Sequence, residues 1–75
     1  MNKHQLANRK RWVHNAREKQ CRYVLVVFDE FTCEEYPVYC KDSSEVDESR
    51  PLYHGVDMQE VVEVIDTTSE IYCKL

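Results

Sequence analysis

The chain has 75 residues, so it forms one small domain, residues 1–75. Its single glycine, Gly55, excludes the glycine-rich loops that bind phosphates in nucleotide-binding proteins. No apolar run approaches the roughly 18 residues of a membrane span, and none follows the N-terminal basic residues as in a secretory signal. These features favour a cytoplasmic protein with no membrane partner, whose four cysteines are thiols.

The charge is distributed unevenly along the chain. Residues 1–22 contain seven basic residues and one acid, a net charge of +6, whereas residues 23–75 contain three basic residues and thirteen acids, a net charge of −10. The sequence therefore predicts a basic arm, residues 1–21, and an acidic body, residues 22–75. The arm is expected to meet an anionic surface, the body a cationic one, or the arm lies on its own body.

The first expected element is a basic helix over residues 3–20. At helical spacing four apolar side chains share one sector, and basic side chains gather on the neighbouring face. The apolar set is Leu6, Trp12, Val13 and Ala16, and the basic set is Lys3, Lys10, His14 and Arg17, with Arg11 close by. Arg9 falls within the apolar sector, so the stripe is narrow. Such a helix is marginal alone and is ordered by docking or by a ligand.

Two strands are expected next. Residues 23–28 form an unbroken apolar run, which predicts a central strand covered on both faces. Residues 36–41 contain Pro37, which has no backbone N–H, so this strand lies at a sheet edge or begins at the proline. The connection over residues 29–35 suits a hairpin loop and predicts an antiparallel pair.

The second half of the body is predicted from turn and cap signals. Residues 42–50 are polar and acidic, which indicates a solvated loop or a frayed helical turn. Asp57 and Glu60 resemble a capping box, and the residues after Asp57 follow the spacing of one buried helical face (Met58, Val61, Val62 and Ile65). Alternation over residues 71–75 favours a final strand over a second short helix. The predicted fold is α+β: a basic N-terminal helix, then a small β-β-α-(β) body with an antiparallel sheet.

The cysteines and histidines are candidate metal ligands and nucleophiles. Cys33 and Cys40 are farther apart than the tight pairs of structural zinc sites, although a hairpin would let them face each other with His54 nearby. A nucleophilic site needs His54 oriented by Asp57 beside a cysteine, and nothing in the sequence fixes that geometry. Buried cysteines acting as small apolar residues are the favoured interpretation. We therefore predict no enzyme activity, no metal site and no cofactor.

The basic helix is a candidate nucleic-acid or partner-binding surface. Arg and Lys neutralise phosphates, and a tryptophan stacks on unpaired bases. The residues concerned are Arg9, Lys10, Arg11, Trp12 and Arg17. This segment resembles the arginine-rich RNA-binding peptides of phage antitermination proteins, which fold to helices on RNA. The charge of the acidic body opposes this interpretation, because it repels a polyanion.

The acidic body is a candidate protein-binding surface. Its carboxylates are expected to lie in a cationic channel of the partner, at the places where the phosphates of a nucleic acid would bind. The candidate residues are Glu34, Glu35, Glu45, Asp47 and Glu48. Tyrosines supply either interface anchors or a small core, and the candidates are Tyr36, Tyr39, Tyr53 and Tyr72. A third alternative is homodimerisation through the basic arm.

Three stretches carry a family resemblance: residues 23–29, residues 36–39 and residues 55–61. The layout is similar to small early proteins of large tailed bacteriophages, of the host-takeover or anti-defence kind. This resemblance implies a protein that binds and inhibits or redirects a host factor, such as RNA polymerase, a nuclease or a defence complex. Our leading interpretation is accordingly a small non-enzymatic interaction protein with a host protein partner. The alternative is an RNA- or DNA-binding protein that uses the basic N-terminal helix.

Overall fold

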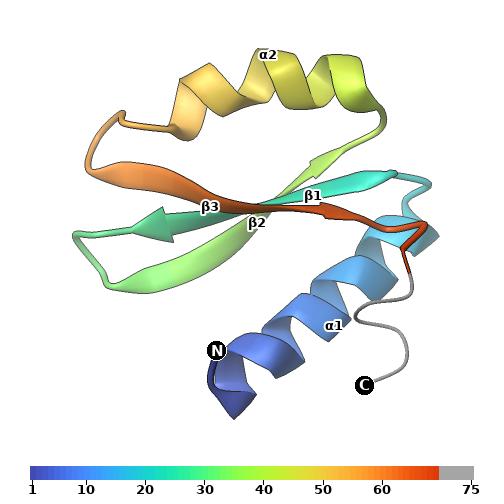
Figure 1. The fold of residues 1–75 in the computed structure, drawn as a ribbon, viewed down its shortest axis with the longest axis horizontal. Helices are drawn as coiled ribbons and strands as arrows, with labels where there is room; N and C mark the ends of the chain where they lie inside the picture. The colour runs from blue at the N-terminus through green and yellow to red at the C-terminus, as the bar shows by residue number, and fades with distance from the viewer. Residues whose placement is uncertain (70–75) are drawn as a thin grey trace.

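The computed structural model describes residues 1–69 and places a three-stranded sheet between two helices (Figure 1). The elements in chain order are α1 (Lys3–Glu18), β1 (Tyr23–Asp29), β2 (Glu34–Cys40), α2 (Ser43–Tyr53) and β3 (Gln59–Asp66). This α-β-β-α-β order, with antiparallel pairing throughout the sheet, confirms the predicted α+β class.

The central strand β1 is covered on both faces. The sheet order is β2-β1-β3, so β1 is central and the proline-containing β2 lies at an edge, as predicted. Val24 and Val26 pack in the cluster beneath α1, whereas Leu25 and Val27 pack in the cluster beneath α2. All four side chains are fully buried. The unbroken apolar run follows from this arrangement, because both faces of β1 meet a helix.

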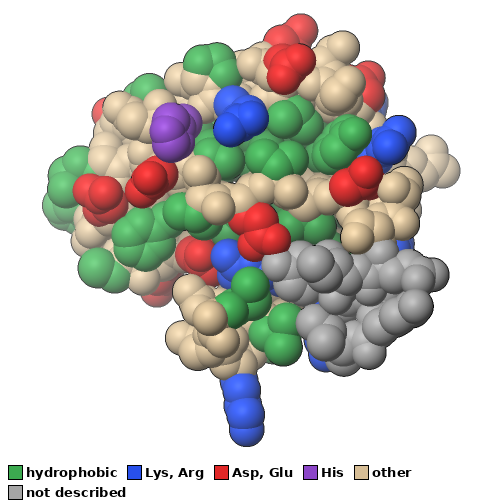
Figure 2. All heavy atoms as spheres, viewed as in Figure 1, with side chains coloured by type: hydrophobic (Ala, Val, Ile, Leu, Met, Phe, Trp, Pro, Cys, Tyr) green, Lys and Arg blue, Asp and Glu red, His purple; other side chains and the backbone are tan. Residues whose placement is uncertain are grey.

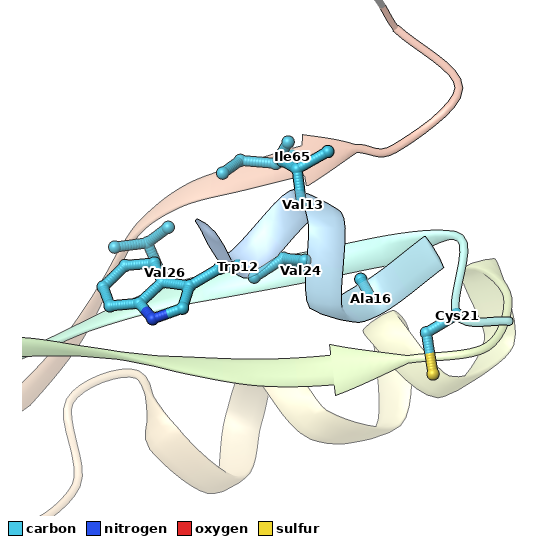
Figure 3. Close-up of a cluster of buried hydrophobic side chains, with 7 residues drawn as sticks. All are labelled: Trp12, Val13, Ala16, Cys21, Val24, Val26 and Ile65. Carbon is cyan, nitrogen blue, oxygen red and sulfur yellow. The ribbon is translucent and has the colours of Figure 1, made fainter. Parts of the chain in front are cut away.

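The basic arm is a docked helix rather than a free extension. Asn2 begins α1 with a capping box: its side chain accepts from the Gln5 N–H at 2.8 Å, and the Gln5 side chain accepts from the Asn2 N–H at 2.9 Å. After the helix, Gln20 adopts a left-handed conformation with φ 59°, which turns the chain into β1. Figure 3 shows side chains of α1 packed against β1 and β3, the set being Trp12, Val13, Ala16, Val24, Val26 and Ile65.

The predicted helix beginning at Asp57 is wrong, because this segment forms β3. Asp57 lies in a turn with φ 52° and caps no helix. The register of β3 against β1 shifts near Val62, at a β-bulge. The extra residue puts Val61 and Val64 on the α2 side of the sheet and Ile65 on the α1 side. A bulged strand thus reproduced the apolar spacing that was taken for a helical face.

Of the two alternatives predicted for residues 42–50, the loop is wrong and the frayed helical turn understates what forms, because the 11-residue helix α2 begins at Ser43. Asp42 caps this helix by accepting from the Glu45 N–H at 3.0 Å, and the Glu45 carboxylate accepts from the Lys41 N–H. Val46 is the one buried residue of α2, so the helix has no apolar stripe to reveal it in the sequence. The strand expected at residues 71–75 lies outside the described residues. No helix in residues 1–69 is long and apolar enough to cross a membrane.

Replacing Trp12, whose residue surface is 4% exposed, tests the docking of α1. We expect Trp12→Ala to lower the free energy of unfolding by about 3–5 kcal/mol, because it leaves a cavity between α1 and the sheet. Urea unfolding followed by circular dichroism measures the change. The matched control is Phe31→Ala in the β1–β2 turn, where the side chain is 81% exposed and a change within about 0.5 kcal/mol is expected. Equal losses in the two variants would contradict the docked helix.

Candidate protein-binding groove

Arg9, the residue that interrupts the apolar stripe of α1, is buried in an ion-pair network. Its guanidinium donates to both carboxylate oxygens of Glu35 at 2.8 and 2.9 Å. Its Nε donates to Glu63 Oε1 at 2.8 Å, and Nη1 donates to the Gln5 carbonyl at 3.3 Å. Glu35 lies on β2 and Glu63 on β3, so one side chain links α1 to both edge strands.

The electrostatics of this network keep Arg9 and Glu35 charged at neutral pH. Hydrogen bonds from Arg9 lower the pKa of the Glu35 carboxyl, and burial opposes them only in part. The same hydrogen bonds to Glu35 raise the pKa of Arg9 further, against desolvation by burial, with Glu63 adding to the rise. Loss of Arg9 would leave the buried Glu35 carboxylate without its cation, whereas loss of Glu35 would leave the buried Arg9 with Glu63 in place of two carboxylates.

A groove of about 520 Å³ lies beside this network, between the N-terminal half of α1 and the β1–β2 hairpin. The α1 wall consists of Asn2, His4, Gln5, Asn8, Arg11 and Trp12, and the hairpin wall consists of Phe28, Cys33, Glu34 and Glu35. The α1 wall therefore supplies amides, an imidazole and a guanidinium. The hairpin wall supplies carboxylates and an aromatic ring.

Each wall is ordered by its own hydrogen bonds. On α1, Arg11 Nη2 donates to Asn8 Oδ1 at 3.0 Å, and Asn8 Nδ2 lies 3.4 Å from His4 Nε2. In the hairpin turn, Asp29 Oδ1 accepts from the Phe31 N–H at 2.9 Å, and Cys33 adopts φ 58° before β2 begins. These local contacts fix the positions of polar groups on both walls.

The predicted basic surface is divided between the interior and the groove. Arg9 and Trp12 are buried, and Lys10 is half-buried. Arg17 donates from Nε to the Thr67 carbonyl at 2.9 Å and so ties α1 to the segment after β3. Arg11 is exposed and lines the groove.

The predicted acidic surface is divided between two faces of the sheet. Glu34 and Glu35 line the groove on the α1 side. Glu45, Asp47 and Glu48 lie on α2, which covers the opposite face. The structure therefore brings part of the acidic set and part of the basic set into one groove.

The structure does not bring the candidate metal and nucleophile residues together. Cys40 pairs with Tyr23 in the sheet, is 1% exposed, and has a pKa raised by burial, whereas Cys33 is exposed in the hairpin turn. His54 Nδ1 accepts from the Val61 N–H at 3.1 Å. Within residues 1–69 no group of three or more metal-ligating side chains is found.

Three candidate tyrosines are half-buried and pack against the core, and Tyr72 lies outside the described residues. The rings of Tyr36 and Tyr53 meet edge to face at 6.3 Å between centroids, and the Tyr36 hydroxyl donates to the Gln59 side chain. Tyr39 packs against the α1-side cluster. These contacts favour a core role for the three tyrosines over interface anchors.

Several residues that line the groove were not predicted from the sequence, namely Asn2, His4, Gln5, Asn8 and Phe28. The Asn2–Gln5 spacing is a capping-box signal that would have set the start of α1. Nothing local to Phe28 indicates that it faces α1. Comparisons with protein-family models, curated proteins and solved structures find no match.

Replacing Glu35 tests the ion-pair network. We expect Glu35→Gln to lower the free energy of unfolding at pH 7 by about 2–4 kcal/mol, because Arg9 loses its bidentate partner. The folded-state pKa of Glu35 is depressed, so its contribution is present above the unfolded value of about 4.3 and is lost as the pH falls through the folded value. The difference between the parent and the variant, measured by urea unfolding across this range, should shrink in acid.

The matched control is Glu48→Gln on the exposed surface of α2, where no such pH-dependent difference is expected. A difference for Glu35→Gln that stays constant from neutral to acid pH would contradict the network.

Proposed function

We propose that this chain is a small non-enzymatic interaction protein that binds a partner protein through the groove between α1 and the β1–β2 hairpin. The proposal rests on one observation: the two walls of the groove face each other and carry different chemical groups. Arg11 and the amides of α1 stand on one side, and the carboxylates Glu34 and Glu35 stand on the other. A polypeptide carries donors, acceptors and charges of both signs, so it complements both walls at once.

The groove favours a protein over a nucleic acid. Glu35 is neutralised by Arg9, but Glu34 is exposed, and a phosphate entering the groove would meet its carboxylate. The volume suits a few anchoring side chains rather than a whole macromolecular surface. Phe28, which is half-buried on the hairpin wall, adds apolar surface against which the aliphatic part of such a side chain packs.

The consequence of binding is proposed from the family resemblance alone. Small early proteins of large tailed bacteriophages inhibit or redirect host factors, and in that setting the partner is a bacterial protein. The setting is then the bacterial cytoplasm, which suits the free cysteines Cys21, Cys33 and Cys40.

Site-specific photo-crosslinking tests the groove as the binding site. A photoreactive residue at His4, on the α1 wall, should capture a discrete protein from a nuclease-treated bacterial lysate. The same residue at Asp47, exposed on α2, serves as the control and should not capture it. Charge reversals at the groove, Glu34→Lys and Arg11→Glu, should each abolish capture, whereas Glu48→Lys on α2 should leave it intact. Capture from Asp47 but not from His4 would contradict the groove.

Nucleic-acid binding is the second candidate, and it is favoured by the exposed cations Lys3, Arg11, Lys19 and Arg22. Trp12 is in the core and offers no ring to a base. Lys19 and Arg22 lie over the rings of Tyr39 and Tyr23, at 5.6 and 5.3 Å from the centroids.

We expect no measurable affinity for single- or double-stranded RNA or DNA by fluorescence anisotropy at low salt. If binding occurs, weakens steeply with salt and is lost in an Arg11→Ala, Lys19→Ala variant, the nucleic-acid function replaces the proposed one.

A further inference from the structure

Within residues 1–69, the outer side of β3 is covered over its first half and uncovered over its second. The Gly55 N–H donates to the Gln59 carbonyl at 2.8 Å, and the Val61 N–H donates to His54 Nδ1 at 3.1 Å. The turn between α2 and β3 therefore covers the start of the strand. Beyond Val61, no strand within residues 1–69 pairs with this side, because β3 ends the sheet order.

Backbone groups and apolar side chains both point outward at this open half. The Thr67 N–H donates to the Arg22 carbonyl at 2.7 Å, and strand N–H groups alternate in direction, so the N–H and C=O of Val64 point away from β1. Val62 and Val64 are 46% and 37% exposed. An open edge with apolar side chains is a template for another strand. The opposite edge is blunted, because Pro37 interrupts β2.

The charges of β3 indicate what kind of strand fits. Glu63 pairs with Arg9, and Asp66 pairs with Arg22 at 3.5 Å between Nη2 and Oδ2. These two acids are neutralised by arginines of the same chain, and the third acid of β3, Glu60, is exposed at the start of the strand that the turn covers. The acids beside the open half therefore neither attract a basic strand nor repel an acidic one. The complementary strand is then apolar and β-branched, and Val61–Ile65 of a second copy has this composition.

We propose that the chain forms a two-fold symmetric homodimer in which the β3 edges of two copies pair antiparallel about Val64. The pairing joins two three-stranded sheets into one of six strands. The axis is perpendicular to the sheet, so both α2 helices lie on the same side and Val64 lies beside Val64 of the second copy.

The exposed surface on that side fits the proposed contact. Figure 2 shows hydrophobic side chains gathered in a band between α2 and β3, with acidic, basic and histidine side chains along its borders. In the dimer the bands of the two copies become continuous. The groove is built by α1 and the hairpin, so it does not include the β3 edge and remains accessible.

Sedimentation equilibrium of the full chain tests the dimer. The expected mass is twice the 9.0 kDa of one chain, and Val64→Lys should return it to one chain because a lysine at the pairing edge opposes strand addition. Phe31→Lys is the matched control, since it places the same charge on an exposed apolar site in the β1–β2 turn, and it should remain dimeric. A parent chain that is monomeric at every concentration, or a Val64→Lys variant that stays dimeric, would overturn the proposal.

Hydrogen exchange gives a second measurement that needs no variant. The Val64 amide should exchange more slowly as the protein concentration rises, because it becomes hydrogen-bonded only in the dimer. Exchange at Val64 that is independent of concentration would place any dimer interface elsewhere, such as on α1, and would overturn the β3 pairing even if Val64→Lys fails to fold.

Discussion

The Arg9 guanidinium sits between Glu35 and Glu63, and the position of α1 depends on it. A buried cation must be paired, and its two partners lie on the strands that flank β1. Satisfying both carboxylates therefore places α1 across the central strand, where Trp12, Val13 and Ala16 pack on Val24 and Val26. Charge sets where the helix docks, and apolar burial stabilises it there.

This constraint turns a bipolar sequence into a layered molecule. Two arginines of the arm bind groups of the same chain: Arg9 is buried in the ion-pair network, and Arg17, although exposed, binds the Thr67 carbonyl. Of the exposed cations of α1, Arg11 faces the hairpin carboxylates across the groove, whereas Lys3 does not line it. The acids of α2 lie beyond the sheet, so the molecule has a mixed-charge groove on one side and an acidic helix on the other. This arrangement is why we favour a protein partner.

The sequence predicted the parts whose signals are local. The apolar run of β1, Pro37 at an edge and the helical spacing of the arm all correspond to observed features. The prediction for the second half of the chain was wrong for two reasons. The bulge near Val62 gives β3 the apolar spacing of a helical face, and α2 buries only Val46, so it has no apolar stripe. The helical spacing showed that Arg9 falls within the apolar sector. It could not show the partners of Arg9, because Glu35 and Glu63 are brought to it only by the pairing register of the sheet. The groove was unpredictable for the same reason.

A double-mutant cycle between Arg9 and Glu35 tests this account most directly. The free energies of unfolding of the parent, Arg9→Met, Glu35→Met and the double variant give the coupling between the two side chains. We predict a favourable coupling of about 2 kcal/mol or more, with the double variant less destabilised than the sum of the single ones. Arg9→Met leaves the buried Glu35 carboxylate without its cation, and Glu35→Met leaves the buried Arg9 with Glu63 in place of two carboxylates. Additive effects, with a coupling near zero, would mean that the Arg9–Glu35 ion pair does not hold α1 in place and would contradict the account.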